Sequence, residues 1–141
     1  MSHYPDLSNK VVLVTGAGSG IGQALANRFA DQGARVAVND VDIEAAARTC
    51  AQIADAGGLA IAVPCDVASS EQVGVMFDQV ESQWGHVQVL VNNAGLVGPM
   101  LHFFEATEEW WRRIIDVNLT GHFLCAHRAA RPMARAGKGV I

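Results

Sequence analysis

A short apolar run that breaks into a cluster of glycines constrains the fold of this chain more than any other stretch. Val11 to Val14 are branched residues in one continuous run, which is typical of a strand buried on both faces of a parallel sheet. Glycines occupy every second position from Gly16 to Gly22, and Ile21, Leu25 and Phe29 then recur at helical spacing. The stretch therefore predicts a strand, a tight turn and a helix packed through that apolar face.

The glycine turn also suggests a ligand. Glycines allow a positive φ and close approach to the main chain, and the free N–H groups of a helix start suit a pyrophosphate. The spacing Gly16-x-x-x-Gly20-x-Gly22 differs from the usual Gly-x-Gly-x-x-Gly, so an ordinary strand-to-helix turn stays open as an alternative. A second apolar run over 35–39 ends at Asp40, 18 residues past Gly22. An acidic residue about 20 residues on meets the adenosine ribose in dinucleotide-binding folds, which makes dinucleotide binding the leading hypothesis.

The rest of the chain alternates expected helices and strands. Helices are expected over 43–56, from Ser69 or Ser70 to 84, and from Thr107 to about residue 133. Strands are expected over 59–64 and 87–91. Such alternation predicts an α/β fold, a Rossmann-like doubly wound parallel sheet in three α/β/α layers with strand order 3-2-1-4. The ligand crevice should open between the first and fourth strands.

Composition excludes several classes of function. The 141 residues suit one domain, and the net charge of −4 with scattered basic residues argues against nucleic acid as a partner. No apolar stretch approaches the length of a membrane span, and the first residues lack the features of a secretion signal. Three widely spaced cysteines indicate reduced thiols and a cytoplasmic location. The five histidines lack metal-ligand spacing, so we expect no metal site and solvent-facing histidines.

Four motifs carry a family resemblance. In chain order they are Thr15-Gly-Ala-Gly-Ser-Gly-Ile-Gly22, Cys65-Asp-Val67, Asn92-Asn-Ala-Gly95 and Asp116-Val-Asn-Leu119. Together they resemble the short-chain dehydrogenase/reductase family of nicotinamide-dependent oxidoreductases. The resemblance covers the whole chain, and its end, Gly139-Val-Ile141, resembles the start of the family's fifth strand, which is only begun here.

The resemblance implies roles for particular residues. By resemblance, Gly16, Ser19, Gly20, Ile21 and Gly22 lie at the pyrophosphate, and Asp66 and Val67 lie at the adenine. The residues along the crevice are Asn92, Asn93, Ala94 and Gly95. Asn118 matches the asparagine of the family's catalytic tetrad, which holds a water of the proton relay through its backbone. From the residues alone, structural roles stay open: Asp66 can cap a turn, Asn92 and Asn93 can form one, and Asn118 can be structural.

One departure from the family is severe. The family's active-site serine and its Tyr-x-x-x-Lys pair should follow the fifth strand, yet Tyr4 is the one tyrosine here and Lys10 and Lys138 are the two lysines. We therefore expect residues 1–141 to be a single NAD(P)-binding domain, the cofactor half of a longer dehydrogenase acting on a small secondary alcohol or ketone. The alternative is a non-catalytic nucleotide-binding or scaffold module. Downstream sequence with the missing motifs would favour the enzyme.

Two further expectations concern the cofactor and the assembly. Asp40 suits both ribose hydroxyls and repels a 2′-phosphate, and no basic residue stands at Ala17 or Val41, so we expect NAD in preference to NADP. The segment from Glu108 to Met133 is apolar around most of its middle. A helix of that kind is buried or meets a partner, which predicts a homo-oligomer, dimer or tetramer, with this helix at the seam.

Overall fold

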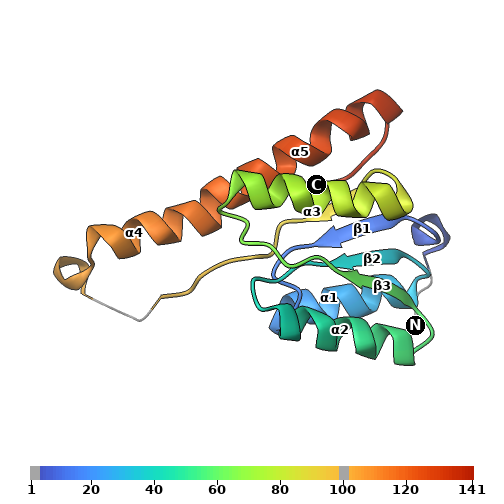
Figure 1. The fold of residues 1–141 in the computed structure, drawn as a ribbon, viewed down its shortest axis with the longest axis horizontal. Coiled ribbons are helices and arrows are strands. Elements are labelled where there is room, and N and C mark those ends of the chain that lie inside the picture. Colours follow the sequence, from blue (N-terminus) through green and yellow to red (C-terminus); the bar gives the residue numbers. More distant parts are fainter. Residues whose placement is uncertain (1–3, 99–101) are drawn as a thin grey trace.

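Four parallel strands form the centre of the molecule. The computed structural model describes residues 4–98 and 102–141. The sheet has the order β3-β2-β1-β4 that the sequence predicted, as Figure 1 shows. The strands are β1 (Val11–Val14), β2 (Arg35–Val38), β3 (Leu59–Ala62) and β4 (Val89–Val91). Strands β3 and β4 are shorter than expected, although Val63 and Val87 beside them remain buried.

The side chains of β1 alternate between the two faces of the sheet, and helices cover both faces. Val12 and Val14 pack in a cluster with residues of α1 (Gly20–Asp31) and α2 (Ile43–Asp55), which cover one face of the sheet. Leu13 points the other way, into a cluster with residues of α3 (Ser70–Trp84) and α5 (Gly121–Ala136). A central strand with helices on both faces has no solvated side, which explains its continuous apolar run.

The expected apolar face of α1 is confirmed only in part, because Leu25 and Phe29 pack against the cluster on this side of the sheet whereas Ile21 does not. Ile21 is 76% exposed, and Leu25 and Phe29 are only partly buried. The buried residues of this helix are instead small: they are Gly22, Ala26 and Ala30. The start of α1 lies so close to the glycine loop that only glycine fits at Gly22, its first buried position. The other buried residues then follow at four-residue intervals, on the same side of the helix.

The expected long helix is present, but it is not buried all round. It consists of α4 (Glu108–Ile115), a π-helical turn (Asp116–Thr120) and α5. One face is buried at four-residue spacing through Val117, Gly121, Cys125, Ala129 and Met133. The other face leaves Trp111, Leu119 and Phe123 exposed.

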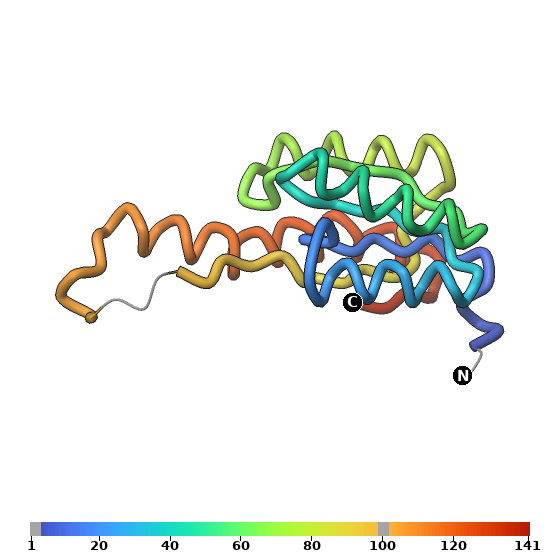
Figure 2. Tube along the Cα trace, turned by 90° about the horizontal axis from the view of Figure 1, so that it is seen from below, coloured from blue at the N-terminus to red at the C-terminus, as the bar shows by residue number. Residues whose placement is uncertain are grey.

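Arg128 fixes α5 onto α3. Its guanidinium forms two hydrogen bonds to Glu81, at 2.9 and 3.0 Å, and a third to Asp78 at 2.7 Å. The same group lies 5.5 Å from the ring centre of Phe77. Hydrogen bonds to both carboxylates raise the pKa of Arg128, most strongly the bond to Glu81. These contacts hold α5 beside the sheet and leave α4 to project beyond it, as Figures 1 and 2 show.

The two ends of the described chain lie near the sheet. A short 3₁₀ turn (Pro5–Leu7) precedes β1, and another (Phe103–Glu105) precedes α4 at the tip of the projection. Val140 pairs in parallel with Val89 of β4, at the place expected for a fifth strand. No helix within the described residues is long and apolar enough to cross a membrane.

Candidate functional site

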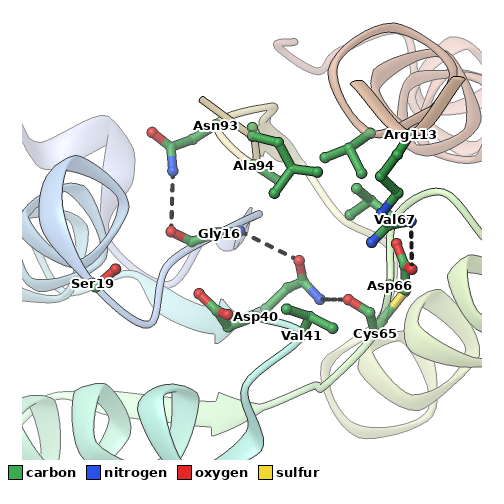
Figure 3. Close-up of a pocket in the computed structure, with 14 residues that line it drawn as sticks. Gly16, Ser19, Asp40, Val41, Cys65, Asp66, Val67, Asn93, Ala94 and Arg113 are labelled. Carbon is green, nitrogen blue, oxygen red and sulfur yellow. Dashed lines mark hydrogen bonds and ion pairs between the residues drawn. The ribbon is translucent and has the colours of Figure 1, made fainter. Parts of the chain in front are cut away.

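A cavity of about 300 Å³ lies at the carboxyl ends of the strands, shown in Figure 3. Its lining comes from the loops after all four strands and from the helix that includes α4. The lining residues are Gly16, Ser19, Asn39, Asp40, Val41, Cys65, Asp66, Val67, Asn93, Ala94, Gly95, Leu96, Arg113 and Val117. The cavity therefore reaches across the β2 and β3 ends as well as the expected crevice between β1 and β4.

Thr15 and Asn93 join the loops after β1 and β4. The Thr15 hydroxyl donates to the carbonyl of Val91 and accepts hydrogen bonds from the backbone N–H groups of Asn93 and Ala94, each at 3.0 Å. The Asn93 side chain donates to the carbonyls of Thr15 and Gly16, at 2.9 and 3.1 Å. Both side chains bond to backbone groups of the opposite loop, so they hold the loops after β1 and β4 together beside the cavity.

Asn92 lies on the other side of β4. Its side-chain amide donates to the carbonyl of His122 on α5, and its Oδ1 is buried without a hydrogen-bond partner among the described residues. Asn93, and not Asn92, lines the cavity. Strand alternation accounts for this, because Leu90 and Asn92 point to the α5 side, whereas Val91 packs on the α1 and α2 side and Asn93 contacts the loop after β1.

Asn39 is a buried polar residue that the sequence analysis missed. Its side chain is 1% exposed and donates to the carbonyls of Val63 and Cys65, both at 3.1 Å. Its Oδ1 accepts a hydrogen bond from the backbone N–H of Gly16 at 3.4 Å. Asn39 thus ties the ends of β1, β2 and β3 around the cavity floor. In the sequence, the one indication of this role is the position of Asn39, a polar residue between a buried strand and Asp40.

The glycine loop needs its glycines at two positions. Gly16 has a φ of 64°, and a Cβ there would come within 2.8 Å of the Ala94 Cα. A Cβ on Gly22 would overlap the carbonyl oxygen of Gly16 and lie 2.5 Å from the Asn93 side-chain nitrogen. The loop, the start of α1 and Asn93 are therefore in contact through backbone, which places main-chain groups beside the cavity. Gly20, Ile21 and Gly22 themselves are not among its lining residues.

The N-terminus of α1 differs from those of the other helices that begin in a loop. Asp42, Ser69 and Thr107 cap α2, α3 and α4 through their side chains, and each of these helices has an acidic residue in its first turn. Within the described part of the chain, Ser19 makes no such bond at α1, whose first turn has no acidic residue. The first N–H groups of α1 keep their partial positive charge, so an anionic pyrophosphate fits here.

Asp40 is held against the glycine loop. Its Oδ2 accepts a hydrogen bond from the Gly18 N–H at 2.9 Å, and its Oδ1 accepts one from the Asp42 N–H at 3.0 Å. The side chain is half-buried at the cavity wall, while Val41 beside it is 70% exposed. The carboxylate is therefore fixed in orientation, with its remaining acceptor positions available to hydroxyl donors.

Asp66 caps a turn, as one of the two interpretations of the sequence expected, and it also pairs with a cation. Its Oδ1 accepts from the Ala68 N–H at 3.0 Å, which is a turn-capping bond, and its Oδ2 forms an ion pair with Arg113 at 2.9 Å. Asp66 and Val67 also line the cavity. Val67 contacts α5 where Gly121 stands, since a Cβ there would lie 2.8 Å from Val67.

Cys65 is the thiol in the cavity lining. Burial raises its pKa to about 11, and the neighbouring charge of Asp66 adds to the effect. The thiol is therefore protonated at neutral pH, and a nucleophilic role for it is disfavoured because the thiolate is the reactive form.

Asn118 holds the loop after β4 by two hydrogen bonds. Its Oδ1 accepts from the Leu96 N–H at 2.7 Å, and its side-chain nitrogen donates to the Leu96 carbonyl at 2.9 Å. Asn118 lies in the π-helical turn, and single π turns inside helices are frequent at functional sites. The side chain closes the loop against the helix, so the observed contacts of Asn118 are structural.

Replacing Asn118 with alanine should release this loop. Loss of both bonds is expected to speed amide hydrogen exchange at Leu96 by about 30-fold, because two hydrogen bonds of about 1 kcal/mol each correspond to about 2 kcal/mol. The matched control is Asn27→Ala, which removes a side chain on α1 that bonds Gln52 on α2, away from the loop. Unchanged exchange at Leu96 in Asn118→Ala would show that the clamp does not order the loop.

The remaining expected residues are placed as follows. The His122 ring lies 2.8 Å from the carbonyl of Ala94, and His86 has a buried ring nitrogen, so the expectation of solvent-facing histidines is wrong for these two. His3 lies outside the described residues. In residues 4–98 and 102–141, no three His, Cys, Asp or Glu side chains converge on a point that could hold a metal ion.

The tyrosine and the lysines lie away from the cavity. Tyr4 is near the amino ends of the strands, where its N–H donates to Gln32. Lys10 directly precedes β1, and Lys138 shares with it a groove beside Gln88. The cavity is at the opposite, carboxyl edge of the sheet, so these residues do not contribute a proton-transfer group to it.

Comparisons with known proteins agree with this geometry. A family model described as short chain dehydrogenase matches residues 10–141. Cis-4-hydroxycyclohexanecarboxylate dehydrogenase of Sinomonas cyclohexanicum is 40% identical over 134 residues, covering 95% of this chain and 53% of that protein. The 3beta-hydroxysteroid dehydrogenase 1 of Eggerthella lenta is 43% identical over 127 residues, covering 89% and 48%.

A solved structure gives the same result for the fold. A metagenomic short-chain oxidoreductase in complex with NADP has a TM-score of 0.90 and 33% identity to this chain, covering 95% of this chain and 60% of that one. The chain thus spans about half the length of the two similar dehydrogenases.

Proposed function

The chain belongs to the short-chain dehydrogenase/reductase family, and from this premise we propose that it is the cofactor-binding part of an oxidoreductase. The reaction is hydride transfer between a nicotinamide dinucleotide and a secondary alcohol or ketone. The proposal rests on the cavity at the strand ends. Asp40 and Asp66 line this cavity, and the start of α1, which has no side-chain cap, adjoins it.

The described residues suit successive parts of a dinucleotide. Backbone N–H groups at Ser19 and the following turn, where the helix has no side-chain cap, would hold the pyrophosphate, and Gly16 would border it. Asp40 would accept from the ribose hydroxyls, and Asp66 with Val67 would border the adenine. Ala94 and Gly95, positioned by Thr15 and Asn93, would line the nicotinamide side. When bound, the nicotinamide would accept a hydride from the alcohol or, in its reduced form, supply one to the ketone.

The proton of the alcohol needs a separate group. Asn118 is proposed to hold a water of the relay through its backbone, while its side chain keeps the loop at Leu96 in place. The Tyr and Lys residues within the described chain lie at the other edge of the sheet, so in this proposal the enzyme takes its catalytic tyrosine and lysine from sequence outside this stretch. The dehydrogenases compared above act on cyclic alcohols by name, which makes a cyclic secondary alcohol the first substrate to try.

The test is cofactor binding and turnover by the full-length protein. Titration with NADH and NADPH should show binding at micromolar concentrations, and NAD reduction should follow on addition of cyclohexanol or a hydroxysteroid. Binding without turnover over a panel of secondary alcohols and ketones would favour the non-catalytic nucleotide-binding module. Absence of binding to either dinucleotide would contradict both functions.

We also propose that the enzyme is a homo-oligomer whose seam is the exposed face of the long helix. Trp111, Leu119 and Phe123 are each more than half exposed and share one side at multiples of four residues. Exposed large apolar residues in such a row typically mark an interaction site. Two such faces can meet about a twofold axis.

Phe123→Glu tests the seam. Burying a carboxylate in an apolar contact is unfavourable by several kcal/mol, so this variant should sediment as a monomer at micromolar concentration. The matched control is Val75→Glu, because Val75 is 63% exposed on α3, away from the row. That variant should keep the wild-type oligomer. A monomeric wild-type enzyme with full activity would contradict the proposal.

The cysteines support a reducing compartment such as the cytoplasm. Cys50, Cys65 and Cys125 are all free. Burial raises the pKa of Cys50 to about 11 and that of Cys125 to about 12, so all three thiols stay protonated at neutral pH. Slow labelling by a thiol reagent in the native protein, followed by labelling of three thiols on unfolding, is the expected result.

A further inference from the structure

Arg113 lines the cavity and lies outside the four family motifs. It lies on α4, five positions before Asn118, and its side chain reaches from the helix to the loop after β3, as Figure 3 shows. Its Nη1 lies 2.9 Å from Asp66 Oδ2. The ion pair therefore spans the gap between the projecting helix and the adenine end of the cavity.

The neighbouring arginine shows that this contact is specific to position 113. Arg112 pairs with Glu108 one turn earlier on its own helix, and both of these side chains are largely exposed. Arg113 instead pairs across elements, with side-chain exposures of 45% for the arginine and 26% for Asp66. A partly buried pair is screened less by salt than a surface pair, so the Arg113 contact is the less screened of the two.

The pair also fixes the direction of the Asp66 carboxylate. One oxygen is held by the Ala68 N–H and the other by Arg113, while the Asp66 N–H donates to Gln72. An ionised carboxylate has about four acceptor positions, so about two remain for a ligand. Which positions remain depends on Arg113, because the bond to Ala68 alone leaves the second oxygen free to turn.

Charge adds a second effect. Asp40 and Asp66 both line the cavity, and Arg113 is the cationic side chain among its lining residues. A dinucleotide carries two negative charges on its pyrophosphate. With Arg113 present, the charge of Asp66 is balanced by a guanidinium nitrogen 2.9 Å away, and Asp40 is the remaining carboxylate facing the ligand. Without Arg113, the charge of Asp66 would add to that of Asp40 in repelling the pyrophosphate.

We propose, on the basis of the proposed function, that Arg113 is a positioning residue for the adenosine end of the cofactor. It acts through Asp66, by orienting the carboxylate and balancing its charge, and it joins the α4 projection to the cofactor cavity. The ligand class is an adenosine diphosphate moiety, as in NAD or ADP-ribose.

ADP-ribose binding to the full-length protein tests this proposal. Arg113→Met keeps most of the side-chain length and removes the charge, and it should weaken ADP-ribose binding about tenfold at low salt. The loss should shrink to about threefold at roughly 0.5 M salt, since screening acts on charge and not on packing. Arg113→Lys should restore most of the affinity. Arg112→Met is the matched control and should bind like the wild type.

A coupling experiment separates positioning from general damage to the fold. In an Asp66→Asn background, Arg113→Met should cost clearly less than in the wild type, because the carboxylate that Arg113 orients is already gone. Failure of the wild type to bind ADP-ribose and NADH would refute the proposed function itself. Wild-type binding with no loss in Arg113→Met, or with an equal, salt-independent loss in both backgrounds, would overturn the role of Arg113 alone.

Discussion

Replacing Gly22 with alanine is expected to raise the dissociation constant for NADH by at least about 100-fold and to destabilise the protein by about 3 kcal/mol. The added methyl group would overlap the carbonyl oxygen of Gly16 and press on the Asn93 side-chain nitrogen. Both neighbours are fixed, since Asn93 donates to the carbonyls of Thr15 and Gly16. The start of α1 must therefore move away from the loop.

The effect on binding follows from the same movement. The N–H groups proposed to hold the pyrophosphate belong to the loop and to the first turn of α1. If α1 moves away from the loop, these donors no longer point at one common site. Thermal unfolding and NADH titration of the variant give the two quantities.

Gly74→Ala is the matched control for this substitution. Gly74 lies inside α3, and a Cβ added there would have no heavy atom within 4 Å beyond its own helical turn. Alanine should therefore raise the free energy of unfolding by about 0.5–1 kcal/mol and leave binding unchanged. Near wild-type NADH affinity in Gly22→Ala would show that the close contact between loop and helix is not needed for binding.

The strand order could be predicted because it depends on local patterns. The run from Val11 to Val14 is apolar without interruption, and only a central strand covered on both faces requires this. Each following helix is long enough for a parallel crossover, and right-handed crossovers then leave few alternatives. The caps at Ser69 and Thr107 were likewise predictable, since a side-chain oxygen at a helix start acts on backbone two or three residues away.

The orientation of the asparagines after β4 is predictable from strand alternation, although the family motif alone assigns Asn92 to the crevice. Extending the alternation from Leu90 by two residues places Asn92 on the α5 side and Asn93 toward the glycine loop, as observed. The motif identifies the right segment, and the period of the strand decides which of its residues faces the cavity.

The tertiary contacts of Asn39 and Arg113 could not be predicted from one sequence. Each pairs with residues far along the chain: Asn39 with the carbonyls after β3, and Arg113 with Asp66. Neither contact is determined by a local sequence pattern, because each depends on how the ends of separate strands and a projecting helix are placed relative to one another. Arg112 and Arg113 are indistinguishable in sequence, and only the direction of the helix face separates a surface pair from a cavity residue.

Exchanging the charge at the end of β2 is expected to reverse the cofactor preference. The wild type should bind NADH about 100-fold more tightly than NADPH, a difference of about 2.7 kcal/mol, because the Asp40 carboxylate faces the position proposed for the ribose hydroxyls. In Asp40→Ala/Val41→Arg, the repelling charge is lost and the exposed position beside it gains a guanidinium suited to phosphate. That variant should prefer NADPH.

The ratio of the two dissociation constants is the quantity to measure, because Asp40 has a structural role as well. Its bonds to the N–H groups of Gly18 and Asp42 are lost in the variant, so binding of both cofactors should weaken together while their ratio inverts. Asp42→Asn removes a charge two residues away and keeps a side-chain oxygen to cap α2. The ratio should stay at its wild-type value in this control, since only the carboxylate at the cavity wall distinguishes a hydroxyl from a phosphate. A wild type that binds NADPH more tightly would show that Asp40 does not select the cofactor.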